Sequence, residues 1–114
     1  MKKFIALLLF VLATPAIAAD TADRNIEIVF DKNKGSIYAV YARALRENPG
    51  LSGKIVVSFD IATTGNVTGC RVRSSTLGSP DLDRNICDKI QLMKFAPRRS
   101  AFTATKTIDF FPAA

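Results

Sequence analysis

The chain has 114 residues, 48% of them hydrophobic, and a formal net charge of +6. A chain of this length closes about one hydrophobic core, which leaves no room for a second functional unit. The sequence contains no histidine, so the most common general base of enzymes is missing.

The N-terminal segment has the layout of a secretory signal peptide. Lys2 and Lys3 precede an apolar run from Phe4 to Ala13, and Pro15 and the small residues of Ala16-Ile17-Ala18 follow. The run is shorter than the roughly 20 apolar residues that cross a bilayer comfortably. We therefore expect residues 1–18 to be a cleaved leader and residues 19–114 to form one exported domain, with an uncleaved membrane anchor as the alternative.

The charge of the exported part argues against nucleic acid as a partner. Without Lys2 and Lys3 the formal net charge falls from +6 to +4. The remaining basic residues are spread along the chain between carboxylates, whereas nucleic-acid binders cluster them on one face. Export of the domain also argues against nucleic acid as a partner.

The two cysteines, Cys70 and Cys87, both lie in the exported part. An even cysteine count in a small exported domain favours a structural disulfide, and the spacing is not that of a C-x-x-C redox motif. Two buried free thiols are the alternative.

The first half of the domain shows a helical pattern. Between Gly35 and Glu47 the apolar residues recur at i, i+3, i+4, i+7 and i+8, and Asn48-Pro49-Gly50 ends the pattern. The segment Ile26 to Phe30 fits both an alternating strand and a helical face, and we favour the helix.

Two strands and a turn follow. Alternation at Ile55, Val57, Phe59 and Ile61 predicts a half-buried strand, and a second strand is expected from Val67 to about Ser75. The turn between them, Thr63-Thr64-Gly65-Asn66, has a glycine that can supply a positive φ. The strands are expected to form a hairpin with Cys70 and Val72 on one face and Arg71 and Arg73 on the other.

The last elements are a helix and a strand. Ser79-Pro80-Asp81 has the signature of a helix start, and a stripe of apolar residues follows, with Cys87 beside it and able to face Cys70. Pro97-Arg98-Arg99 predicts a loop, and the segment from Phe102 to Phe111 is expected to form a third strand. Because this strand lies at the chain end, we expect it at the edge of the sheet.

These residues in this order resemble a known family, the AgmX/PglI C-terminal domain, which is similar in turn to the C-terminal domain of the energy transducer TonB. The resemblance covers essentially the whole exported part. The residues that carry it are Val29-Phe30-Asp31-Lys32-Asn33-Lys34-Gly35, Tyr41, Ala44-Leu45-Arg46, Asn48-Pro49, Gly53-Lys54, Gly65-Asn66-Val67, Cys70-Arg71-Val72, Ser74-Ser75, Leu77, Leu82, Phe95, Ile108-Asp109-Phe110 and Pro112.

The resemblance implies an α+β fold of order α-β-β-α-β, with a three-stranded antiparallel sheet packed against two helices. It also implies a periplasmic, non-enzymatic module, without cofactor, that binds a cell-envelope protein or peptide by adding a strand to its edge strand. The binding residues expected by analogy are Ala104, Lys106, Ile108 and Phe110, with Arg98 and Arg99 able to meet an acidic group. The alternative is a structural subunit that forms a homodimer or docks permanently in an envelope complex.

The sequence supports an enzyme or a metal site less well than a binding module. Ser74-Ser75-Thr76 resembles a nucleophile cluster, but a strand end entering a loop explains it better because no paired base can be named. Asp81, Asp83 and Asp88 suggest a cation site, but the first two suit the first turn of a helix. Arg71 and Arg73 could bind a phosphate or an acidic partner, but a solvated strand face explains them better. The sequence favours Tyr41 in the core, whereas Tyr38 lies off the buried stripe and could contact a partner. Phe110 and Phe111 point to opposite faces of the last strand, so that one of them could be exposed.

Overall fold

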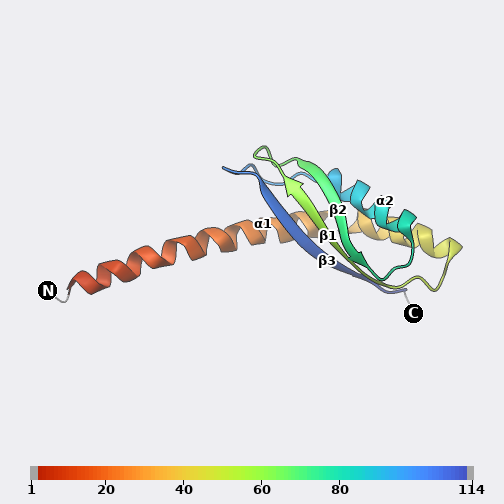
Figure 1. The fold of residues 1–114 in the computed structure, drawn as a ribbon, viewed down its shortest axis with the longest axis horizontal. Coiled ribbons are helices and arrows are strands. Elements are labelled where there is room, and N and C mark those ends of the chain that lie inside the picture. Colours follow the sequence, from red (N-terminus) through yellow and green to blue (C-terminus); the bar gives the residue numbers. More distant parts are fainter. Residues whose placement is uncertain (1–2, 113–114) are drawn as a thin grey trace.

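The computed structural model describes the backbone of residues 3–112 and the side chains of residues 24–112. Two helices and three strands follow one another in the expected order α-β-β-α-β (Figure 1). Their bounds are α1 Lys3–Glu47, β1 Gly53–Ile61, β2 Val67–Ser75, α2 Pro80–Gln91 and β3 Phe102–Phe110.

The three strands form one antiparallel sheet in the order β2-β1-β3. Both helices lie on the same face of this sheet, so the molecule has two layers, and the opposite face carries no helix (Figure 1). We call the face of the sheet that the helices cover the helix-facing side, and the opposite face the open face. The position of β3 at an edge of the sheet is the predicted one.

The core lies between the sheet and the two helices. Its largest fully buried side chains come from alternate positions of β1, from the apolar stripe of α2 and from the end of β3. The strand alternation and the α2 stripe predicted from the sequence are therefore confirmed. These side chains are Ile55, Val57, Phe59, Ile61, Leu82, Ile86, Ile90 and Phe110.

Helix α1 includes the segment whose pattern was ambiguous. Ile26, Val29 and Phe30 are buried against the core, as the helical pattern requires, and the helix continues through Gly35 to Glu47. The predicted leader, residues 1–18, lies outside the residues whose side chains are described, and its cleavage stays a prediction. Among the residues that the structure describes, no helix combines the length and the apolar character needed to span a bilayer.

Helix α2 is fixed at its start and in its middle. Ser79 is the N-cap, and its hydroxyl accepts a hydrogen bond from the amide of Leu82 at 3.2 Å. The predicted disulfide between Cys70 and Cys87 is present, with 5.6 Å between the Cα atoms. It ties α2 to β2 across 17 residues of chain, which contributes roughly 3 kcal/mol in the chain-entropy model.

Candidate functional site

The two edges of the sheet differ in regularity. β2 pairs with β1 through two register shifts, one between Val56 and Val57 and one between Asp60 and Ile61. β3 pairs with β1 over nine consecutive residues without a shift. Irregular pairing twists an edge away from further strands, whereas a regular edge strand offers a template for one. β3 is therefore the edge strand with the regular pairing of a template.

The direction of the main-chain groups follows from the hydrogen bonds of β1. The carbonyl of Lys54 accepts from the amide of Thr76 at 2.9 Å, and the amide of Ala62 donates to the carbonyl of Asn66 at 2.8 Å, both toward β2. Directions alternate along a strand, so Ile55 and its alternate neighbours bond toward β3. Their partners in the register are Phe102, Ala104, Lys106 and Ile108.

The outer edge of β3 consequently belongs to the alternate residues Thr103, Thr105, Thr107 and Asp109. Their amides and carbonyls point away from β1, and their side chains are exposed on the open face. No strand among residues 3–112 pairs with them. The carbonyl of Asp109 confirms the direction, because it accepts a hydrogen bond from the Tyr38 hydroxyl of α1 at 3.3 Å.

The residues predicted for binding have a different role in the strand. Ala104 and Phe110 are buried in the core, at 5% and 0% exposure, and Ile108 is half-buried. The main-chain groups of Ala104, Lys106 and Ile108 are directed at β1. The predicted strand thus lies at the edge, but the main-chain groups that it offers come from the threonine row that sequence reasoning missed. The alternation of the segment was the signal that could have separated the two sets.

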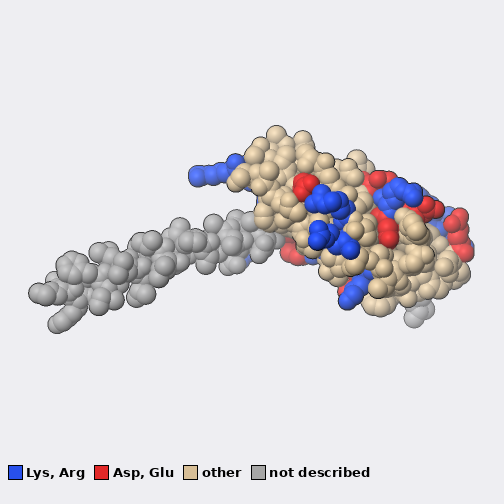
Figure 2. All heavy atoms as spheres, viewed as in Figure 1, with Lys and Arg blue, Asp and Glu red and all other residues tan. Residues whose placement is uncertain are grey.

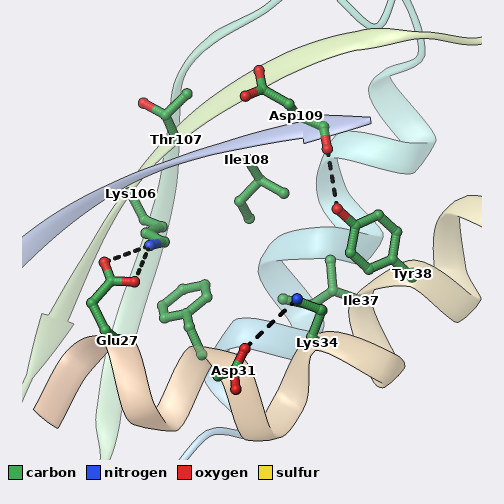
Figure 3. A pocket seen from close by; sticks show the side chains of 10 residues that line it. Glu27, Asp31, Lys34, Ile37, Tyr38, Lys106, Thr107, Ile108 and Asp109 are labelled. Atoms are coloured by element: carbon green, nitrogen blue, oxygen red, sulfur yellow. Dashed lines mark hydrogen bonds and ion pairs between the residues drawn. The ribbon is translucent and has the colours of Figure 1, made fainter. Parts of the chain in front are cut away.

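A groove runs between α1 and the helix-facing side of β3. Its larger part has a volume of about 330 Å³, and its apolar lining comes from Phe30, Ile37, Tyr38 and Ile108 (Figure 3). Lys34 and Asp31, paired at 3.6 Å, lie along the helical rim. We call this part the Ile108 slot.

The second part of the groove lies further toward the start of β3. It has a volume of about 280 Å³ and is lined by Ile26, Phe102 and Ala104, together with Thr103 and Thr105. We call this part the Ala104 slot.

An ion pair between Glu27 and Lys106 separates the two slots, since both residues line both parts of the groove. The Lys106 ammonium donates to both Glu27 carboxylate oxygens, at 2.8 and 2.7 Å, and lies 5.5 Å from the centroid of the Phe30 ring (Figure 3). These contacts leave the Lys106 side chain 24% exposed, whereas the Glu27 side chain is 65% exposed.

Tyr38 lines the Ile108 slot, and two phenylalanines, Phe110 and Phe111, stand at the end of β3. Tyr38 is 40% exposed, and its ring packs edge-on against Phe110 at 5.3 Å. Phe111 is 71% exposed, while Phe110 is fully buried, so the expectation that one of the two would be exposed is confirmed. Tyr41 lies in the core, as predicted.

The two arginines before β3 have different environments. The Arg98 amide donates to the Thr63 carbonyl at 2.9 Å, and its guanidinium lies 5.3 Å from the centroid of the Phe102 ring. Arg98 thereby attaches the loop to the start of β3. Arg99 is exposed. Binding of an acidic group by either residue stays a prediction.

The open face carries a polar network that crosses all three strands. Arg71 of β2 forms a bidentate pair with Asp60 of β1, at 2.9 and 3.2 Å, and Thr103 of β3 donates to the same carboxylate at 2.8 Å. The hydrogen bonds from Arg71 and Thr103 hold the pKa of Asp60 below its ordinary value. Arg71 is thus explained by this pair, and charges of both signs are interspersed on the face (Figure 2).

The other candidates have structural partners. Ser75 donates to Asp83 at 2.8 Å, which joins the end of β2 to the start of α2, and the Thr76 hydroxyl accepts from the Lys54 amide at 2.9 Å. Asp81 pairs with Arg84 within α2. In the part of the chain that the structure describes, no three acidic or cysteine side chains gather as a metal site would require.

Comparisons with known proteins found a matching family model and a similar fold. The model of the family "Gram-negative bacterial TonB protein C-terminal" matches residues 38–111. A solved structure, the solution NMR structure of the Pseudomonas aeruginosa TonB CTD, is similar with 27% sequence identity and a TM-score of 0.52, over 60% of this chain and 73% of that chain. No curated protein sequence matches the chain. The narrower resemblance to the AgmX/PglI C-terminal domain stays a prediction.

Proposed function

Because the chain belongs to the TonB protein C-terminal family, we propose that it is a protein-binding module that takes an extended peptide segment onto the outer edge of β3. The added strand pairs with the main-chain groups of Thr103, Thr105 and Thr107, next to the Asp109 carbonyl, which Tyr38 already engages. In such pairing the main-chain hydrogen bonds supply affinity, and the pockets beside the strand supply specificity.

One observation carries the proposal: β3 keeps an unbroken register of nine residues with β1 while its outer amides and carbonyls have no partner strand among the described residues. An unpaired regular edge is a liability that proteins blunt with irregularities or cover. β2 has such irregularities and β3 does not. A binding role would therefore explain why the regular outer edge of β3 is left without a partner strand.

We propose further that the module acts in the periplasm, without catalysis, on a cell-envelope protein. The leader-like start of the sequence and the disulfide between Cys70 and Cys87 support this location. The hydroxyl and carboxylate groups with catalytic potential, such as Ser75 and Asp83, are engaged in holding the fold together.

The test uses a displayed library of random nine-residue peptides, the length of β3. Thr105→Pro removes one outward amide from the edge and leaves the bonds to β1 in place, because proline is tolerated at an edge position whose amide faces solvent. Thr105→Val is the matched control, since it removes the same hydroxyl and keeps the amide. We expect peptides selected on the wild-type domain to bind Thr105→Val equally well and Thr105→Pro at least tenfold more weakly.

Equal binding to both variants would contradict the proposal. A homodimer through the same edge is the other outcome to examine, and sedimentation at micromolar concentration detects it. A stable dimer that Thr105→Pro converts to monomer, together with no selected peptides, would mean that the edge serves a structural subunit.

A further inference from the structure

The two slots of the groove and the ion pair between them follow the alternation of side chains along β3. The helix-facing residues Ala104, Lys106 and Ile108 lie at successive alternate positions, and all three line the groove. Ala104 borders one slot, Ile108 borders the other, and Lys106 lies in the ion pair between them. The two slots are therefore four residues apart, roughly 13 Å along a strand.

A strand added to β3 repeats this spacing. Side chains of neighbouring strands that point to the same side lie next to one another, about 5 Å apart at Cβ. The helix-facing side chains of the peptide, at positions i, i+2 and i+4, thus lie beside the Ala104 slot, the Glu27–Lys106 pair and the Ile108 slot. The intervening side chains of the peptide point to the open face, beside the exposed side chains of the threonine row.

The three positions differ in chemistry. Each end slot has an apolar part between its polar rims, formed by Ile26 and Phe102 in one slot and by Phe30 and Ile37 in the other. These apolar parts favour apolar side chains. The middle position covers an ion pair whose carboxylate is 65% exposed. An apolar side chain there would take this carboxylate out of water without replacing the lost hydrogen bonds, whereas a hydroxyl or amide group can donate to it.

Resting on the proposed function, we infer that the domain selects extended peptide segments with apolar side chains at i and i+4 and an uncharged hydrogen-bonding side chain, such as Thr, Ser or Asn, at i+2. The Glu27–Lys106 pair is the specificity-determining element for the middle position. The slots at either side set the spacing of the apolar positions.

The experiment repeats the nine-residue library selection on the wild-type domain and on the double variant Glu27→Leu/Lys106→Met. The variant replaces the ion pair by apolar groups of similar length. We expect the wild type to enrich the apolar, hydrogen-bonding, apolar pattern and the variant to enrich apolar residues at i+2 as well. In a selected peptide, Thr→Val at i+2 should weaken binding to the wild type about tenfold and strengthen binding to the variant.

A second variant, Glu27→Gln, provides an independent test in case the double variant does not fold. It preserves the shape of the side chain and leaves the charge of Lys106 without its partner, so the selected residue at i+2 should move to Asp or Glu. An unchanged preference at i+2 in both variants overturns the inference while leaving strand addition standing. Absence of any peptide whose binding depends on Thr105→Pro overturns strand addition itself.

Discussion

Tyr41 joins the end of α1 to the loop before β1 through one buried hydrogen bond. Its hydroxyl donates to the Leu51 carbonyl, and its side chain is 3% exposed. Burial of the phenol raises its pKa, because the charged form would lose its hydration. The stability that this phenol contributes is therefore present below its ordinary pKa and declines as the pH rises beyond it.

We expect Tyr41→Phe to lower the free energy of unfolding by about 1 to 2 kcal/mol, since the buried Leu51 carbonyl loses its donor. Urea unfolding monitored by circular dichroism measures the change. Tyr38→Phe is the control, because its hydrogen bond to Asp109 is exposed and 3.3 Å long, and its loss should cost less than about 0.5 kcal/mol. Equal losses in the two variants would contradict this account.

Asp60 connects the three strands on the open face and titrates below its ordinary pKa because Arg71 and Thr103 donate to its carboxylate. A lowered pKa in the folded state gives a contribution to stability that is present above the ordinary pKa. This contribution is lost as the pH falls through the lowered value.

The Arg71→Met variant should therefore raise the pKa of Asp60 toward its ordinary value, as measured by NMR titration of the side-chain carboxyl carbon. The acid limb of the unfolding curve should then become less steep. An unchanged Asp60 pKa in Arg71→Met would mean that the bidentate pair is absent in solution.

At the scale of elements, the hairpin between β1 and β2 rests against the loop after α2. Gly65 has φ +94°, and its carbonyl accepts from the Phe95 amide at 2.8 Å. A Cβ at this position would lie 2.0 Å from the Phe95 carbonyl oxygen. Both the backbone conformation and the close approach thus require glycine.

We expect Gly65→Ala to destabilise the domain by at least about 2 kcal/mol, through strain and displacement of the loop. Gly35→Ala is the matched control, because Gly35 lies within α1 and a Cβ there meets nothing within 4 Å. That substitution should stabilise by about 0.5 to 1 kcal/mol. Thermal unfolding compares the two, and the same sign of change in both variants would refute the assignment of Gly65.

The elements themselves could largely be predicted from the sequence, because their signals are local. The alternation of Ile55, Val57, Phe59 and Ile61 depends on a strand period of two, and the start of α2 depends on Ser79 and Pro80. The irregular pairing of β2 could not be predicted, since a register shift depends on how two strands meet. The main-chain direction along β3 depends on the same register.

At the scale of the whole molecule, the site is made by contacts between α1 and β3, which lie far apart in the sequence. Glu27 and Lys106 are 79 residues apart in sequence, and Tyr38 and Asp109 are 71 apart. Hydrophobic periodicity predicts that β3 belongs to the sheet, but it does not predict which helix lies beside the strand. The sequence therefore predicted the edge strand and missed the groove with its dividing ion pair.

The outer main-chain groups of Thr103, Thr105 and Thr107 have no partner strand in the free domain, and we expect them to be paired in the complex. Amide hydrogen exchange, resolved by residue with NMR, measures both states with a peptide selected from the library. We expect the Thr105 and Thr107 amides to exchange fast in the free domain while those of Ala104 and Lys106 are protected, and to become protected on binding. Slow exchange of Thr105 and Thr107 in the free monomer, or no change when the peptide binds, would contradict the account.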